Sequence, residues 1–197
     1  MNPSFFSRRI GQAIIIAFIA GGVLIVASGD FTKFFSYTRG HLQEQKASVL
    51  VALLQNATTT SLIPVYRVAD GDTIDVSVRG GVATVRLLGI NTPEVVDPRK
   101  PVECFGPEAS AEAHGILDGG EVHLELDPSQ DVYDKYGRVL AYVYLPDGTF
   151  FNKLMIEGGF AREYTYHSKY KYQQEFRTAQ KSAKSSGLGL WAPGVCN

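Results

Sequence analysis

Residues 64–90 constrain the fold more strongly than any other part of the chain. Partly alternating apolar and polar residues predict three short strands there, over 64–69, 74–78 and 82–90. Two turn signals separate the strands, Asp-Gly-Asp at 70–72 and Arg-Gly-Gly at 79–81. Short strands joined by Gly-containing turns are typical of a meander, so we predict an antiparallel sheet for this segment.

The rest of the body adds two strands and three helices. The apolar pattern predicts strands over 122–126 and 139–145 and helices over 106–117, 151–157 and 173–185. Pro107 stands in the first turn of its helix, where its missing N–H costs nothing, and Gly187 ends the last helix. Five strands with about three helices in roughly 130 residues fit a small closed or nearly closed β-barrel.

Composition excludes several other classes of protein. The 197 residues carry a formal net charge of −1, with 45% hydrophobic and 20% charged residues, which excludes a wholly disordered or collagen-like chain. Residues 1–61 carry a net +3 (five basic, two acidic), residues 62–161 a net −8 (eight against sixteen) and residues 162–197 a net +4 (six against two). With so little overall charge, any attraction to phosphate must come from local patches or from metal.

An apolar run over 10–27 precedes the body, with Gln12 as its only polar side chain. As a helix it would be about 27 Å long, close to the hydrocarbon thickness of a bilayer, and Arg8 and Arg9 before it favour a cytoplasmic N-terminus. We predict an uncleaved transmembrane helix with the body outside the cytoplasm. A cleaved signal peptide is an alternative, because small residues at 27–29 suit a cleavage site, and the protein would then be secreted. A buried helix of a soluble protein is a third interpretation of the run.

These patterns divide the chain into three parts. Residues 1–29 form a cytoplasmic stub and the membrane anchor, residues 30–61 a linker, and residues 62–197 the folded domain. Within the linker, residues 47–54 can form a short helix, and the aromatic residues at 31–37 suit a headgroup boundary.

Polar residues with catalytic chemistry gather at the turns of the predicted barrel. Asp72 follows the first strand, Arg86 and Glu94 lie in and after the third, and Arg138 follows a Gly-containing turn. A hard cation requires several oxygen ligands, two arginines can bind one phosphate, and a carboxylate can take a proton from water. Together these are the parts of a metal-assisted phosphodiester hydrolase, although each residue alone is equally well explained by a turn, a cap or an ion pair.

Four short motifs, taken in order, resemble the staphylococcal nuclease (thermonuclease) family: D-G-D-T at 70–73, R-L-L-G-I-N-T-P-E at 86–94, F-G-P-E-A-S at 105–110 and D-K-Y-G-R at 134–138. The resemblance runs from about Val65 to Trp191. It implies an oligonucleotide-binding (OB-fold) barrel with helices. It also implies a Ca²⁺-dependent endonuclease that cuts DNA and RNA, preferably single-stranded, with little sequence preference and leaves 3′-phosphates. We expect a monomer.

The same resemblance implies roles for the residues that match the motifs. Arg86 and Arg138 look like the phosphate-binding arginines, and Glu94 looks like the catalytic glutamate that activates or orients water. The metal ligands it implies are Asp72, Asn91 and the backbone carbonyl of Thr92. Implied substrate contacts are Tyr136, Tyr164 and Tyr166 around the nucleotide, with Lys100 and Lys135 as outer phosphate contacts.

Asn91 departs from the family pattern, because it stands where the staphylococcal enzyme has a second ligating aspartate. An amide still offers an oxygen but removes one negative charge from the site. We therefore expect weaker calcium binding than an aspartate would give, with activity retained.

Cys104 and Cys196 are the only two cysteines of the chain. In an extracytoplasmic domain they could form a disulfide between the C-terminus and the loop before the first helix of the body. Two free thiols are the alternative, and we favour the bond.

Two further function classes compete with the membrane-tethered nuclease. One is a non-catalytic nucleic-acid-binding OB-fold module, and the other is a calcium-stabilised adhesion domain. A binding module has no need of Asp72, Arg86, Glu94 and Arg138 together, and an adhesion domain leaves the two arginines unexplained. The sequence therefore favours the enzyme.

Overall fold

The computed structural model describes residues 14–19, 22–27, 44–52, 54, 61–79, 81–95, 101–166 and 168–196. They fall into two compact units, Met1–Leu42 and Gln43–Asn197. In the first unit, β1 (Ile14–Ile19) and β2 (Gly22–Ala27) form an antiparallel pair in which Ile14 faces Ala27.

This pair differs from the helix predicted over residues 10–27. Isoleucine and valine make up much of both strands, and β-branched side chains fit a pleated strand better than a helix. The glycines at 21 and 22, near the middle of the run, also weaken a helix. Among the residues that the structure describes, no helix combines the length and the apolar character needed to cross a membrane.

The second unit contains the closed five-stranded barrel that the sequence predicts, in the order β3-β4-β5-β8-β7. Antiparallel pairs join β3 to β4, β4 to β5, β7 to β8 and β3 to β7, whereas β5 and β8 run parallel. The strands are β3 (Ile63–Asp70), β4 (Thr73–Val78), β5 (Gly81–Leu87), β7 (Glu121–Glu125) and β8 (Val139–Tyr144).

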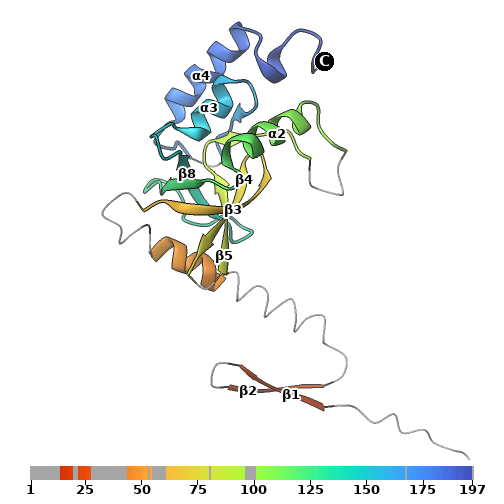
Figure 1. Ribbon diagram of the computed structural model, residues 1–197, viewed down its shortest axis with the longest axis vertical. Coiled ribbons are helices and arrows are strands. Elements are labelled where there is room, and N and C mark those ends of the chain that lie inside the picture. Colours follow the sequence, from red (N-terminus) through yellow and green to blue (C-terminus); the bar gives the residue numbers. More distant parts are fainter. Residues whose placement is uncertain are drawn as a thin grey trace, which may run out of the picture. The chain divides into compact units, whose positions relative to one another are not determined.

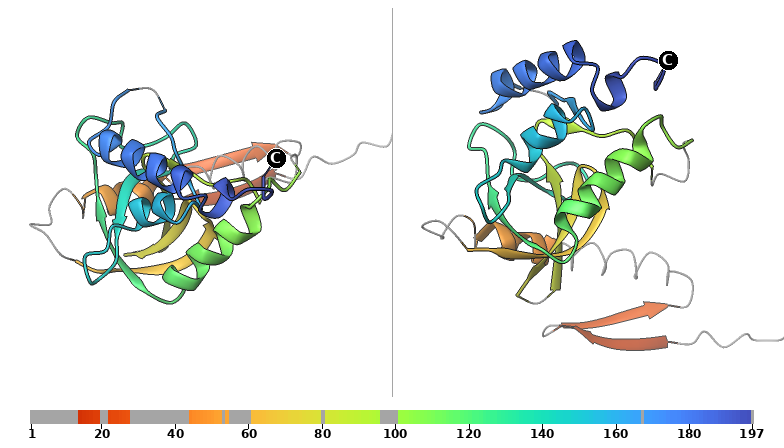
Figure 2. Two further views of the ribbon diagram at one scale, coloured as in Figure 1. Left: turned by 90° about the horizontal axis from the view of Figure 1, so that it is seen from above. Right: turned by 45° about the horizontal axis from the view of Figure 1, so that its top comes forward.

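Three helices lie outside the barrel, over the ranges that the sequence predicts: α2 (Gly106–Leu117), α3 (Phe151–Glu157) and α4 (Gln173–Ser185). Helix α2 packs against β3, and α3 packs against β8 and α4, so the helices gather around one end of the barrel (Figure 1). A short 3₁₀ turn, η1 (Gly189–Trp191), follows α4. Figure 2 shows α3 and α4 side by side in two further views.

Residues 44–52 form an additional helix at the other end of the barrel, drawn in orange in Figure 1. Its apolar side buries Ala47, Leu50 and Val51 in the same core as the strands. The compact unit therefore begins at Gln43 and includes this helix, which the sequence analysis placed in the linker.

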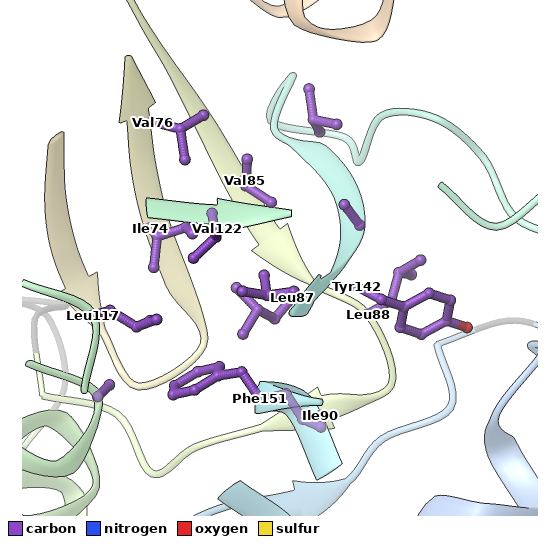
Figure 3. Close-up of a cluster of buried hydrophobic side chains, with 14 of the residues drawn as sticks. Ile74, Val76, Val85, Leu87, Leu88, Ile90, Leu117, Val122, Tyr142 and Phe151 are labelled. Carbon is purple, nitrogen blue, oxygen red and sulfur yellow. The ribbon is translucent and has the colours of Figure 1, made fainter. Parts of the chain in front are cut away.

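Inward-facing residues of the strands fill the barrel. Figure 3 shows Ile74, Val76 and Val85 pointing into the interior, with Phe151 of α3 closing it from below. These side chains are at most 1% exposed. Such a packed interior leaves no room for a ligand inside the barrel, so a binding site must lie on its outer surface.

The predicted third strand, 82–90, divides in two. β5 ends at Leu87, and the separate strand β6 (Ile90–Asn91) pairs with β9 (Arg162–Glu163) instead. Gly89 causes the break, because its φ of +76° is a left-handed conformation that favours glycine. Its carbonyl accepts a hydrogen bond from the Tyr164 N–H, which brings the segment after β9 close to the end of β5.

A disulfide joins Cys104 to Cys196, with their Cα atoms 5.8 Å apart. It ties the segment after η1 to the loop before α2, so the bond that the sequence favoured is present.

Candidate active site

A cleft of about 1260 Å³ lies on the outer surface of the barrel. Its walls come from the β3–β4 turn, the end of β5, β6, residues 128–131, 133–136 and 138, and residues 164, 166, 168 and 170. The predicted site residues within the described chain all line it: Asp72, Arg86, Asn91, Thr92, Glu94, Lys135, Tyr136, Arg138, Tyr164 and Tyr166. Lys100, the remaining predicted contact, lies outside the described residues.

Asp72 occupies the turn between β3 and β4 and is 5% exposed. Its Oδ2 accepts a hydrogen bond from the Thr92 N–H (3.0 Å), and its Oδ1 accepts one from the Thr73 hydroxyl (3.0 Å). Gly71 permits this close approach, since a Cβ there would lie 2.6 Å from the Thr92 Cγ2 atom. The D-G-D-T motif thus needs its glycine to bring Asp72 and Thr92 together.

Arg86 lies beside Asp72, and its side chain is 13% exposed. Its Nη1 donates to the carbonyls of Leu87 (2.7 Å) and Ile90 (2.9 Å). Its Nη2 lies 2.8 Å from Asp72 Oδ2 and donates to Asn91 Oδ1 (3.1 Å). The guanidinium is therefore fixed before any substrate binds, which is the arrangement that favours electrostatic stabilisation of developing charge.

Asn91 links this cluster to the Thr92 backbone. While its Oδ1 accepts from Arg86, its Nδ2 donates to the Thr92 carbonyl oxygen (3.2 Å). An aspartate could not donate the second of these bonds. The departure from the family pattern therefore affects the hydrogen bonding of the site as well as its charge.

Asp70 is a site residue that the sequence analysis missed. It lines the cleft, and its Oδ1 accepts a hydrogen bond from the Asp72 N–H (3.1 Å). Burial, together with the neighbouring Asp72 carboxylate, raises the pKa of Asp70 to about 7. The signal in the sequence was the second carboxylate of the D-G-D motif.

Arg138 lies at the end of a hairpin closed by the D-K-Y-G-R motif, and Gly137 takes a left-handed φ of +77° at its turn. Asp134, also missed at the level of sequence, holds this hairpin together. Its Oδ1 accepts from the N–H groups of Tyr136 and Arg138 (both 2.9 Å), and its Oδ2 accepts from Arg138 Nε (2.6 Å). Within the described chain no acceptor contacts the two Nη groups of Arg138, so they remain available to a phosphate.

The three predicted tyrosines line the cleft with exposed rings. The β6–β9 pair places Asn91 opposite Arg162, and Tyr164 and Tyr166 follow directly with ring centroids 6.0 Å apart. Both rings are exposed, at 43% and 53%. The third, Tyr136, is 68% exposed and lies under Lys135 and Arg138, 5.0 and 5.3 Å from its ring centroid.

Glu94 follows β6 and lines the same cleft at half-buried depth. Its backbone carbonyl accepts a hydrogen bond from the Glu103 N–H (2.9 Å). The loop that carries Glu94 is thus held by the segment containing Cys104, which the disulfide in turn fixes to the C-terminus.

Comparison with known proteins places this site in a family. The family described as "Staphylococcal nuclease homologue" matches residues 84–193, which is more than half of the chain. The chain belongs to this family.

Individual relatives agree with that assignment. The thermonuclease of Staphylococcus intermedius is 39% identical over 173 residues, covering 88% of this chain and 97% of that protein. The thermonuclease of Staphylococcus hyicus is 42% identical over 128 residues, 65% of this chain and 74% of that protein. An SPbeta prophage-derived endonuclease of Bacillus subtilis, YokF, is 41% identical over 127 residues, 64% of this chain but only 42% of its own length. This member of the staphylococcal nuclease family is accordingly a phosphodiester-hydrolysing nuclease.

The oxygens beside Asp72 suit a hard cation such as calcium, which prefers carboxylate, carbonyl and amide oxygens. Asp70 and Asp72 line the same cleft as Asn91 and Thr92, and Asp72 Oδ2 accepts a hydrogen bond from the Thr92 N–H. Burial and the neighbouring Asp72 carboxylate raise the pKa of Asp70, and a cation close to both carboxylates would favour the charged form of Asp70. In the part of the chain that the structure describes, no three His, Cys, Asp or Glu side chains group to hold a metal.

Proposed function

We propose that this nuclease is a calcium-dependent endonuclease that cuts both DNA and RNA, preferably single-stranded and with little sequence preference. The main support for the proposal is that one cleft, on a barrel of this family, is lined by Asp72, Arg86, Glu94 and Arg138. Asp70, Asp72, Asn91 and the Thr92 carbonyl would hold the ion. When bound, calcium supplies positive charge beside the phosphate oxygens.

The side chains of the cleft account for the chemistry of hydrolysis. The Glu94 carboxylate takes a proton from the attacking water as the water oxygen bonds to phosphorus. The Nη groups of Arg138 and the fixed Arg86 guanidinium stabilise the charge that develops on the phosphoryl oxygens. The bond to the 5′-oxygen breaks, the departing oxygen takes up a proton, and the 3′-phosphate remains on the shortened strand.

Weak sequence preference follows from the way the bases would be held. Tyr136, Tyr164 and Tyr166 offer exposed ring faces, and every base can stack on such a face. Lys135 and Lys100 would contact outer phosphates. These contacts select a flexible strand with unstacked bases over a duplex.

The decisive test measures cleavage of denatured DNA and of RNA by the purified full chain, with calcium and with chelator. We expect calcium-dependent cutting that Glu94→Gln slows by about 10²- to 10⁴-fold, the usual contribution of a general base. Glu121→Gln is the matched control, because Glu121 is exposed on β7 and does not line the cleft. A folded wild type that binds single strands without cutting them would support the non-catalytic binding module instead.

We also propose that the protein is a monomer held at a membrane by residues 10–27, with the nuclease domain outside the cytoplasm. The support is the apolar run and the preceding Arg8 and Arg9. Among the described residues β1 and β2 pair only with each other. An open sheet edge is costly in hydrocarbon, so this segment would have to become helical in a membrane. Alkaline carbonate extraction of membranes tests the anchor. Release of the whole chain into the supernatant would contradict it. Release of a shorter chain, from which the leader has been cleaved, would indicate a secreted protein.

A further inference from the structure

One exposed aromatic residue in the cleft has no part in the function proposed so far. Tyr133 is 38% exposed and lines the same cleft as Arg138 and Tyr136. Within the described chain its hydroxyl makes no hydrogen bond, so its ring is not held by a polar contact. A large ring left exposed inside a cleft is suited to stack on another flat group.

Tyr133 is rigidly connected to the phosphate-binding residues. It forms a β-bridge with Val139, and the neighbouring Asp134 N–H donates to the Arg138 carbonyl (3.0 Å). Tyr133 and Arg138 therefore lie in the two arms of one short hairpin, and both line the cleft. A base stacked on Tyr133 would belong to a nucleotide close to the phosphate that Arg138 binds.

Residues 128–131, which precede Tyr133 in the chain, also line the cleft. The Gln130 Nε2 group links this segment to the one after Tyr166 by donating to Ser168 Oγ (3.0 Å) and to the Lys169 carbonyl (3.0 Å). At about 1260 Å³, the cleft exceeds the roughly 300–1000 Å³ of a typical small-ligand pocket. It has room for more than the single nucleotide that the Tyr164–Tyr166 pair would hold.

We propose that Tyr133 forms a second base-stacking subsite, which binds the base of a nucleotide adjacent to the one held at Tyr164 and Tyr166. This inference rests on the proposed nuclease function and adds a determinant of substrate length to it. Because stacking accepts any base, the subsite favours strands of several nucleotides over mononucleotides without reading their sequence.

The test measures binding in the full-length Glu94→Gln chain, in which cleavage is suppressed, with calcium present. The probes are a fluorescent oligothymidylate of about twelve nucleotides, within the site sizes of single-strand-binding barrels, and thymidine monophosphate as competitor. Tyr133→Ala should weaken oligonucleotide binding by about 5- to 150-fold, the range for one lost base stack, and leave mononucleotide binding unchanged. Tyr133→Phe should bind like the parent, because it keeps the ring.

Tyr66→Ala is the matched control, since Tyr66 is 65% exposed on β3 and does not line the cleft. Unchanged oligonucleotide binding by Tyr133→Ala would overturn the subsite. An equal loss of oligonucleotide and mononucleotide binding would also overturn it, because the substitution would then have displaced the whole hairpin. A parent chain that binds neither probe would refute the proposed function itself, and the subsite with it.

Discussion

Replacing both Cys104 and Cys196 by serine should lower the free energy of unfolding by about 3–5 kcal/mol. The bond joins residues 92 positions apart, and it restricts the unfolded chain far more than the folded one. In the chain-entropy model a loop of this length corresponds to ~4.6 kcal/mol at 25 °C. The expected loss of stability extends down to about 3 kcal/mol, because residual structure in the unfolded state reduces the entropic effect of the cross-link.

The folded state itself should change little when the bond is removed. Among the described residues, the backbone hydrogen bonds of the segment after η1 run from the Ala192 N–H to the Gly189 carbonyl and from the Val195 N–H to the Ala192 carbonyl, and they do not require the disulfide. Neither cysteine lines the cleft. Cleavage well below the unfolding midpoint should therefore persist, even though the loop carrying Glu94 loses one of its fixed neighbours.

Urea unfolding of the wild type, the double-serine variant and the reduced wild type measures the effect. The variant and the reduced protein should agree in midpoint. Both should show a larger m value than the oxidised protein, because an unfolded chain without the cross-link exposes more surface. A loss below about 1 kcal/mol, or an unchanged m value, would refute the unfolded-state argument.

Three other substitutions test the site and the core. Asn91→Asp adds a negative charge close to Asp72, since both side chains contact Arg86. Calorimetric titration should show calcium binding tightened about tenfold or more, which corresponds to about 1.4 kcal/mol. Unchanged or weaker binding would contradict the charge argument. The pKa of Asp70 is about 7 in the folded state, against its ordinary value of 3.8 in the unfolded state. Between these pH values the stabilising contribution of protonated Asp70 falls as the pH rises, by at most ~1.4 kcal/mol per pH unit. Asp70→Asn in chelator should therefore flatten the stability profile over that window, and a profile parallel to the wild type would exclude the raised pKa. Leu50→Ala should lower the free energy of unfolding by about 2–5 kcal/mol in thermal or urea unfolding, because Leu50 is fully buried. Gln45→Ala, at an exposed position of the same helix, should change it very little. Equal effects of the two substitutions would mean that residues 44–52 do not pack on the barrel.

The local pattern of the sequence was sufficient for most of the barrel and its helices. Strand alternation, glycine turns and a proline in a first helical turn are short-range signals, and the helices at 106–117, 151–157 and 173–185 have the predicted bounds. The same signals were insufficient at 10–27, where an apolar run has no periodicity that separates a helix from a strand pair. They also missed the break at Gly89, because a left-handed glycine is visible only in the backbone.

The candidate site shows the same division between local and long-range information. Residue types and motif order predicted Asp72, Arg86, Glu94 and Arg138 as one set, and the structure brings all four to one cleft. What only the tertiary structure decided is how their neighbours act on them. Asp134 binds Arg138 only after the turn between them has closed. The pKa of Asp70 rises only once folding buries this side chain beside Asp72. Tyr133 lines the cleft only when its hairpin packs on the barrel. Burial and contact across the fold are properties of the folded chain, and no single segment of the sequence carries them.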